Sequence, residues 1–323
     1  MMTRVLKILL LLLGGLFLSG LCGCSPHEFP DDWGNGCRVR LVFDETLPQY
    51  QVLHPATKGE GYAARKVRYT AKLFRFKEAS AYGLNPDYSF SFTRTELDDL
   101  DTTIVLPRME GRFKLAVWAD FVDEEDSLSW KPDDFERIVL AKDYRLGERE
   151  RDAFCGTLDI DPGEVKRNDE PLTMTLRRPV AQIRFYLSNA DEFLAEQNTD
   201  LGGLYVTFRY TAPIPDTYDL LRGHSSGARS GVRLSLYPEI DPFSGELVFF
   251  SDFILAEEEP TSVSVYFAVR DDDGEPYFTF RGDVPILRAH RTDVCFGPQD
   301  DDGSGGGVGI DPGFDGSYNI SID

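Results

Sequence analysis

The stretch 173–187, TMTLRRPVAQIRFYL, limits the fold of this chain more than any other part of the sequence. Apolar and polar residues alternate in it twice, first at Met174 and Leu176 and again after Pro179. Alternation with a period of two is typical of a β-strand with one buried and one solvated face. Proline has no N–H to donate to a neighbouring strand, so Pro179 belongs at a strand start or at an edge. We therefore expect the seam between two β domains here.

The same alternation recurs in short runs along most of the chain. Turn residues separate these runs, and this pattern predicts an all-β sandwich or barrel. Helical signals are confined to 95–98 and 190–197, which are too short to form a layer, so a parallel α/β fold is not expected. The expected strands are 37–43, 67–76, 88–92, 103–106, 111–120, 137–141, 154–160, 203–210, 232–237, 247–255, 262–270, 277–281 and 284–296.

The length of the chain favours two domains. Its 323 residues exceed a typical single domain, which has roughly 100–200 residues. The seam in the middle of the sequence divides the two. The expected units are a signal peptide (1–23), a tether (24–36), an N-terminal β-sandwich (37–172), a C-terminal β-sandwich (173–298), and a Gly/Asp-rich linker with a C-terminal strand (299–323).

The N-terminus has the composition of a secretory signal. Arg4 and Lys7 form a basic region, and 5–18 is an apolar run interrupted only by Lys7 and a Gly-Gly pair. Such a run is too short to cross a bilayer as a mature helix and is typical of a cleaved signal peptide. We therefore exclude it from the fold.

The residues after this run, Leu-Cys-Gly-Cys, resemble the bacterial lipoprotein box. In that motif a small residue precedes a cysteine that is acylated and becomes the new N-terminus. Gly23 before Cys24 fits this rule, whereas the bulky Leu21 before Cys22 does not. Cys24 is therefore the expected lipidation site, and an ordinary signal peptide cut nearby is the alternative. Each buried acyl CH₂ contributes about 0.8 kcal/mol, so several acyl chains would hold the protein on a membrane.

Charge argues against nucleic acid as a partner. The formal net charge is −21, and no long run of Lys or Arg interrupts the acidic background. A polyanion would be repelled unless the fold gathered basic side chains on one face. A strongly solvated surface is the simplest interpretation of this negative charge.

We find no arrangement of residues in the sequence that indicates catalysis, a cofactor or a metal. The histidines His27, His54, His224 and His290 are scattered, without metal-ligand spacing to a Cys or to each other. The serines after His224 lie in an expected loop, 219–231, and lack the flanking glycines of a nucleophile elbow. Asp271–Gly274 reads as a hairpin turn, because the alternating donors of a calcium loop are missing. We expect no enzyme and no cofactor.

Three cysteines remain in the mature chain besides Cys24. They are Cys37, Cys155 and Cys295, and each lies in an expected strand. Apolar neighbours favour buried free thiols. A Cys37–Cys155 disulfide is the alternative, because exported proteins can oxidise their thiols.

The C-terminal tail combines a spacer and a strand. Residues 299–309 are rich in Gly and Asp, and Tyr318, Ile320 and Ile322 then alternate with polar residues. A strand on such a spacer either folds back onto its own sheet or pairs with the open edge of another molecule. Folding back is favoured by the higher effective concentration of an intramolecular partner. Tyr318, Ile320 and Ile322 are the candidate donor strand.

Four segments in order resemble one family. The chain is similar to the fimbrillin-like lipoproteins of Bacteroidales, which include the shaft, tip and anchor subunits of type V fimbriae. The resemblance covers nearly all of the mature chain and lies in the order of the motifs. The segments are LPRMEGRFKLAVWADF (106–121), LRRPVAQIRFYL (176–187), VPILRAHRTDV (284–294) and IDPGFDG (310–316).

This resemblance implies two transthyretin-like β-sandwiches and polymerisation by strand exchange. In shaft-type subunits an arginine-specific protease removes the first strand, and the opened groove accepts the strand of a neighbour. Arg65, in the loop 53–66, is the matching candidate cut site here. An ordinary solvated arginine is the alternative, and an anchor or accessory subunit would keep its first strand.

The sequence thus predicts a structural or anchoring subunit of a cell-surface fimbria. Its expected partners are other fimbrial subunits, the outer membrane through the lipid anchor, and a receptor on a host or bacterial surface. Its expected location is the outer membrane, lipid-anchored and surface-exposed. The alternative is a surface lipoprotein that binds glycans or host ligands without polymerising. Trp118, Trp130 and Tyr144 could then form a stacking platform, although core or rim positions are the favoured interpretation of these three residues. An exported hydrolase has no supporting residues.

Overall fold

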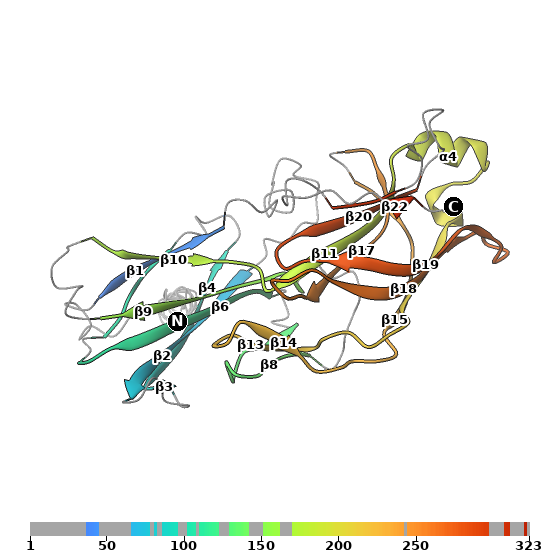
Figure 1. Ribbon diagram of the computed structural model, residues 1–323. Coiled ribbons are helices and arrows are strands. Elements are labelled where there is room, and N and C mark those ends of the chain that lie inside the picture. The colour runs from blue at the N-terminus through green and yellow to red at the C-terminus, as the bar shows by residue number, and fades with distance from the viewer. Residues whose placement is uncertain are drawn as a thin grey trace, which may run out of the picture.

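The protein is described by a computed structural model whose strands form several sheets and whose single α-helix among the described residues, α4 (Ala190–Glu196), lies at one end (Figure 1). The predicted all-β fold is confirmed. The described residues are 37–44, 66–77, 81–82, 86–95, 102–107, 110–122, 129–141, 151–161, 170–241, 244–296, 307–310 and 320–321.

Two sheets form a sandwich in the N-terminal half. One has the strand order β10-β1-β5, and in the other β2 lies between β4 and β6, with β9 beyond β6 and β3 on the end of β2. The strands are β1 (Arg38–Phe43), β2 (Lys66–Lys77), β3 (Ala81–Tyr82), β4 (Tyr88–Thr95), β5 (Thr102–Val105), β6 (Phe113–Val122), β9 (Ala153–Ile160) and β10 (Leu172–Leu176).

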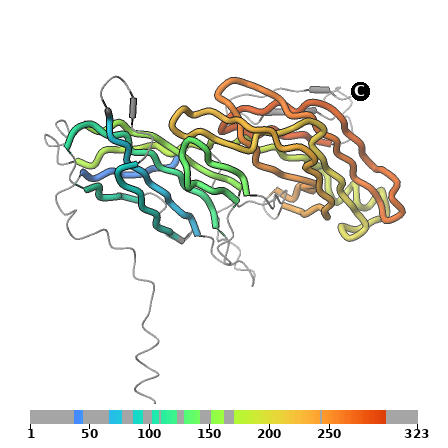
Figure 2. Tube along the Cα trace, turned by 90° about the horizontal axis from the view of Figure 1, so that it is seen from below, coloured from blue at the N-terminus to red at the C-terminus, as the bar shows by residue number. Residues whose placement is uncertain are grey.

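Two further sheets form a second sandwich, and the two sandwiches lie end to end (Figure 2). Their strand orders are β16-β17-β11-β20-β21-β22 and β15-β12-β18-β19. The strands are β11 (Val180–Leu187), β12 (Tyr205–Tyr210), β15 (Arg233–Leu236), β16 (Glu239–Ile240), β17 (Leu247–Leu255), β18 (Thr261–Arg270), β19 (Pro276–Ile286), β20 (Arg291–Phe296), β21 (Gly307–Ile310) and β22 (Ile320–Ser321).

Aromatic side chains fill the core of the second sandwich. Phe185 on β11 is fully buried, and its ring centroid lies 4.8 Å from that of Phe267 and 5.8 Å from that of Phe208. Phe208 in turn stacks on Phe250 at 3.8 Å. These contacts join β11 and β17 to β12 and β18 in the facing sheet, so the predicted alternation of 180–187 serves to bury one face of β11.

A third, smaller sheet joins the two halves of the chain. Its order is β14-β13-β8-β7, with β7 (Trp130–Lys131) and β8 (Ile138–Leu140) from the first half and β13 (Thr217–Asp219) and β14 (His224–Ser226) from the second. Register pairs Ile138 with Tyr218 and Val139 with Thr217. This sheet covers a separate cluster of buried side chains, which we call the junction core: Phe74, Ala116, Trp118, Trp130, Phe135, Ile138, Leu140, Ala153, Cys155, Val180, Tyr218, Leu220, Phe253 and Leu255.

The chain passes from one sandwich to the other around Pro179. β10 pairs in parallel with β1 of the first sandwich, whereas β11 pairs with β17 and β20 of the second. Met174 and Leu176 accordingly lie in the first core. The division of the chain at residue 173 stays a prediction, and these pairings place the change of sheet between Leu176 and Val180.

Three local predictions were wrong. The strand expected at 284–296 is interrupted by a turn, since β19 ends at Ile286 and β20 begins at Arg291, with Ala289 at φ 59° between them. The segment expected as a spacer ends in β21, and the loop expected at 219–231 contains β14. The hairpin at Asp271–Gly274 is confirmed: β18 and β19 pair antiparallel, and Gly274 has φ 88°.

Candidate assembly site

The first strand, β1, is the central strand of its sheet. It pairs in parallel with β10 over Val39–Phe43 and antiparallel with β5 over Arg38–Leu41. Two backbone bonds extend these ladders, Asp44 N–H to Leu176 O at 3.0 Å and Leu106 N–H to Cys37 O at 2.8 Å. Both edges of β1 are therefore satisfied by neighbours, and both neighbours would expose an unpaired edge without it.

The side chains of β1 also fill the first core. Val39 and Leu41 are fully buried, and Phe43 is 5% exposed. The Phe43 ring lies 4.7 Å from Phe154 and 6.1 Å from Tyr69, in both cases edge to face. Full burial of each such side chain contributes about 1.5–3 kcal/mol. A strand in this position could be replaced only by another strand with apolar residues at alternate positions.

The C-terminal residues add strands to one edge of the second sandwich. β21 pairs antiparallel with β20, with Thr292 opposite Ile310, and β22 pairs antiparallel with β21, with Val308 opposite Ile320. Of the candidate donor strand, Ile320 lies in β22, whereas Tyr318 and Ile322 lie outside the described residues. In this structure the described tail strands pair with the chain's own sheet.

Several predicted site residues fall outside the described part of the chain. Cys24 at the lipoprotein box, Arg65 at the candidate cut and Tyr144 of the stacking platform are among them. Among the residues that the structure describes, no helix combines the length and apolar character needed to cross a bilayer.

The two tryptophans lie in a core, as favoured from the sequence, and the alternative of a stacking platform is wrong for them. Trp118 is 0% exposed and Trp130 is 1% exposed, and their rings meet edge to face with centroids 5.5 Å apart. Both lie in the junction core, and Trp130 Nε1 donates a hydrogen bond to Arg151 O at 3.1 Å. They cannot reach a glycan, because packing between the two sandwiches covers both of them.

Buried ion pairs surround the junction core. Arg178 donates two hydrogen bonds to Asp152, each 2.7 Å long, and its guanidinium lies 4.6 Å from the Phe154 ring centroid. Arg151 from the first half pairs with Asp252 on β17 of the second half, and both side chains are buried. The forked Arg178–Asp152 geometry and the pair between the halves both restrict movement of one sandwich against the other.

Two carboxylates near this junction have shifted pKa values. Burial raises the pKa of Asp120, and the two hydrogen bonds from Arg68, at 2.9 and 2.5 Å, only partly offset it. For Glu257, burial also opposes ionisation, but hydrogen bonds from Ser225 and His224 outweigh it and lower the pKa. The two groups therefore differ in how well their charge is compensated.

The contacts of Glu257 also describe the serines that follow His224. The Glu257 carboxylate accepts hydrogen bonds from the hydroxyl and the N–H of Ser225, and His224 Nδ1 lies 3.1 Å from it. A nucleophilic serine requires a histidine that takes up its proton. Here serine and histidine share one carboxylate, an arrangement that connects β14 to the segment after β17. No group of three or more His, Cys, Asp or Glu that could hold a metal occurs among the described residues.

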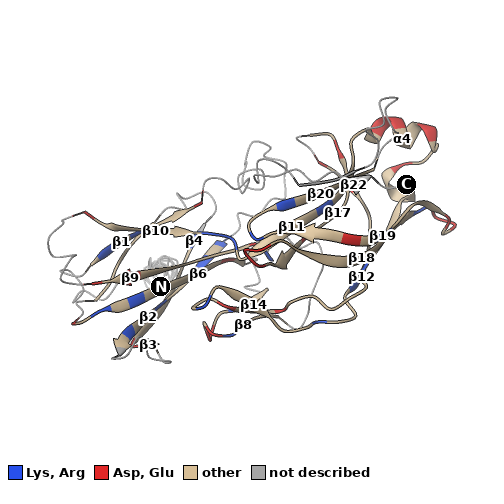
Figure 3. Cartoon of the chain, viewed as in Figure 1, with Lys and Arg blue, Asp and Glu red and all other residues tan. Residues whose placement is uncertain are grey.

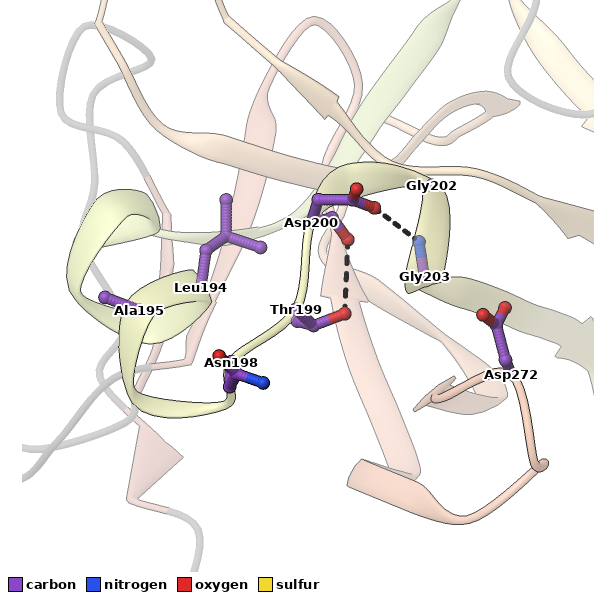
Figure 4. A pocket seen from close by; sticks show the side chains of 8 residues that line it. All are labelled: Leu194, Ala195, Asn198, Thr199, Asp200, Gly202, Gly203 and Asp272. Carbon is purple, nitrogen blue, oxygen red and sulfur yellow. Dashed lines mark hydrogen bonds between the residues drawn. The ribbon is translucent and has the colours of Figure 1, made fainter.

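A depression of about 620 Å³ lies beside α4 (Figure 4). Asp200 Oδ1 accepts a hydrogen bond from Gly203 N–H at 3.0 Å, and Thr199 Oγ1 lies 3.4 Å from Asp200 O. These contacts cap a short 3₁₀ turn at 201–203, so the polar groups of Asp200 and Thr199 are engaged within the turn itself. We assign no ligand to this depression.

The three mature cysteines are free thiols in this structure. Cys155 is buried in the junction core, whereas Cys37 and Cys295 are partly exposed. Burial raises the pKa of the Cys155 thiol to about 11. The expectation of free thiols agrees with this state, but the expected burial holds only for Cys155, and the alternative Cys37–Cys155 disulfide is absent.

Comparison with known proteins gives one family. Residues 34–323 match the sequence model of a family of unknown function, DUF6562. No curated protein matches the chain.

Solved structures similar to the chain come from Bacteroidales. A proposed adhesin from Bacteroides thetaiotaomicron is 10% identical, with 88% of this chain and 98% of that chain covered and a TM-score of 0.47. A proposed polysaccharide-binding protein (DUF1812) from the same species is 12% identical, with 88% and 98% covered and a TM-score of 0.43. The fimbrial anchor protein Mfa2 from Porphyromonas gingivalis is 12% identical, with 88% and 100% covered and a TM-score of 0.38.

Proposed function

Since this chain belongs to DUF6562, a family of unknown function, we propose its role from its own residues: it is a structural or anchoring subunit of a cell-surface fimbria. It is held in the outer membrane by lipid on Cys24 and assembles by β-strand exchange. Its partners are other subunits of the same filament.

The position of β1 is the observation that carries this proposal. β1 is central in a three-stranded sheet and lies next to the chain terminus that bears the lipoprotein box. Removing it would open the first core along Val39, Leu41 and Phe43 and leave β10 and β5 as facing edges. Such a groove matches a donated strand with alternating apolar residues, which is the pattern of Tyr318, Ile320 and Ile322.

The sequence between the lipid site and β1 suits a tether. Residues 24–36 contain two prolines, three acidic residues and a Gly-Asn-Gly. Thirteen residues can span at most about 45 Å when extended. The first sandwich would therefore remain close to the membrane, with the second free to contact a further subunit.

A disulfide that locks β1 to β5 tests strand exchange. Arg40 and Thr103 are register partners on β1 and β5, and both side chains are exposed. We expect the variant Arg40→Cys with Thr103→Cys, once oxidised, to lose the ladder of multimers seen for the wild type in unheated gels of sheared surface material. Reduction should restore the ladder, because β1 can then leave its sheet.

A disulfide between two other strands controls for the general effect of introducing a disulfide. Thr207→Cys with Ser235→Cys joins two strands, β12 and β15, that exchange does not require to separate. This control should give the wild-type ladder in both redox states. An unchanged ladder from the oxidised Arg40/Thr103 lock would show that β1 is not the exchanged strand.

Replacement of the lipid site tests the anchor. We expect Cys24→Ser to move the protein from the membrane fraction to the soluble fraction, because the acyl chains need the thiol. Cys22→Ser is the matched control and should leave it in the membrane. Detergent phase partition of cell fractions gives the measurement. Membrane retention of the Cys24→Ser protein would contradict lipidation at this residue.

A further inference from the structure

A row of basic side chains crosses the outer face of the sheet β15-β12-β18-β19. The strand register places Arg233 opposite Arg209, Arg209 opposite Tyr266, and Tyr266 opposite Arg281. All three arginines are exposed, since the neighbours Leu234, Phe208 and Phe267 point into the core. Strands are about 4.8 Å apart, so the row extends over about 15 Å. We call these four residues the arginine row.

The arginine row has no acidic partner among the described residues. The chain carries 55 acidic against 34 basic residues, and the exposed arginines Arg75, Arg177 and Arg222 each pair with a carboxylate. No ion pair is found for Arg209, Arg233 or Arg281 within the part of the chain that the structure describes. Like charges directly opposite each other on neighbouring strands destabilise a sheet. The row thus has an unneutralised charge that an anion would compensate.

The same face is hollowed and carries hydroxyl groups. Arg209, Arg233, Tyr266 and the hydroxyl residues Thr207 and Ser235 line a depression of about 520 Å³. The Arg209 guanidinium lies 4.7 Å from the Tyr266 ring centroid, and Arg270 Nη2 donates to Tyr266 OH at 3.3 Å. Tyr266 is thereby held between two arginines, which keeps Arg209 flat against the sheet.

Two exposed tyrosines extend this face along the strands. Tyr205 and Tyr237 are 37% and 64% exposed, and their rings meet edge to face with centroids 6.3 Å apart. Tyr205 lies four residues before Arg209 on β12, so the tyrosine pair is about 13 Å from the row. The hydroxyls of Thr207 and Ser235 lie between them. Aromatic rings, hydroxyls and cations therefore follow one another on a single exposed surface.

We propose that this face binds an acidic polysaccharide, with the arginine row taking its carboxylate or sulfate groups and the Tyr205/Tyr237 pair taking a sugar ring. Double-stranded nucleic acid carries one charge per about 1.7 Å, and the net charge of −21 opposes so dense a polyanion. Three arginines over about 15 Å suit anionic groups spaced several ångströms apart. This proposal does not depend on strand exchange.

Affinity electrophoresis of the full-length protein in gels that contain polysaccharide tests the proposal. We expect polygalacturonate and chondroitin sulfate to retard the protein, and neutral dextran not to do so. Comparison of the first two tells whether carboxylate or sulfate is preferred. The variant Arg209→Ser with Arg233→Ser should weaken binding at least tenfold, and Tyr237→Ala should weaken it a few-fold.

A matched variant controls for net charge. Lys131→Ser with Arg137→Ser removes two exposed positive charges outside the arginine row, one on β7 and one in the turn before β8, and should bind like the wild type. The melting temperature of the Arg209/Arg233 variant should not fall, because the two exposed like charges repel each other. Undiminished binding by the Arg209/Arg233 variant, equal binding of dextran, or equally tight binding of DNA or poly-glutamate would overturn the proposal.

Discussion

Replacing Trp118 by alanine should lower the free energy of unfolding by about 3–5 kcal/mol. Trp118 is fully buried in the junction core, where its ring meets Trp130 at 5.5 Å and Tyr218 at 6.1 Å. Trp130 comes from the first half of the chain and Tyr218 from the second. The cavity left by the indole would therefore weaken the contact between the two sandwiches as well as the packing on β6. We expect the sandwiches of the variant to unfold in separate steps.

Chemical denaturation followed by tryptophan fluorescence and by far-ultraviolet circular dichroism would measure this. For the wild type, the two probes should give the same transition with the same midpoint. For Trp118→Ala, the fluorescence and circular dichroism transitions should have different midpoints. Tyr237→Ala is the control, since that side chain is 64% exposed and lies on the outer face of the second sandwich. A single shared transition for Trp118→Ala at the wild-type midpoint would contradict a role of the junction core in joining the halves.

The strands that could be predicted from the sequence are those with one buried and one solvent-exposed face. β1 shows this most simply, because its burial alternates with the apolar residues Val39, Leu41 and Phe43. β6 departs from it, since Ala116 and Trp118 face the junction core while Leu115 and Val117 face the first core. A strand apolar on both faces is the sequence signal of burial on both sides. It could have excluded Trp118 from an exposed platform.

The third sheet could not be predicted as a unit: only β8 lies in an expected strand, 137–141, and the other strands are too short to show a period. β7, β8, β13 and β14 have two or three residues each. β8 and β13 pair although they are almost eighty residues apart in the chain, as Val139 and Thr217 show. Local alternation contains no information on such a pairing. The same holds for the ion pair between Arg151 and Asp252, which no spacing in the sequence indicates.

The candidate sites also differ in whether they can be predicted without knowledge of the fold. Cys24 is predicted from a linear motif and Arg65 from the family resemblance, and both stay predictions because they lie outside the described residues. The arginine row depends on register. Arg209, Arg233 and Arg281 are widely separated in the sequence and meet only because β15, β12, β18 and β19 are aligned at these residues. A basic face can thus exist in a chain that has no basic run and a net charge of −21.

Removing one partner of the buried Arg151–Asp252 pair should cost about 3–5 kcal/mol of unfolding free energy. In Asp252→Ala the Arg151 charge would stay buried without its counterion. The change also removes the acceptor of the Tyr210 hydroxyl at 2.6 Å and of Phe253 N–H at 2.9 Å. Such a loss is far larger than that expected for an exposed pair, because water cannot take the place of the missing carboxylate.

A double variant separates two contributions to the free energy of unfolding: the cost of leaving one charge buried and unpaired, and the net contribution of the ion pair itself. In Arg151→Met with Asp252→Leu no charge remains to be desolvated, so we expect much of the stability lost in Asp252→Ala to return. Glu258→Ala is the control: its pair with Arg288 spans 3.3 Å and its side chain is 82% exposed, so its loss should cost less than about 1 kcal/mol. Equilibrium unfolding in urea measures all three. Equal stability of Asp252→Ala and Glu258→Ala would show that the buried carboxylate of Asp252 contributes no more to stability than an exposed one. The Arg151–Asp252 pair would then not fasten the two sandwiches together.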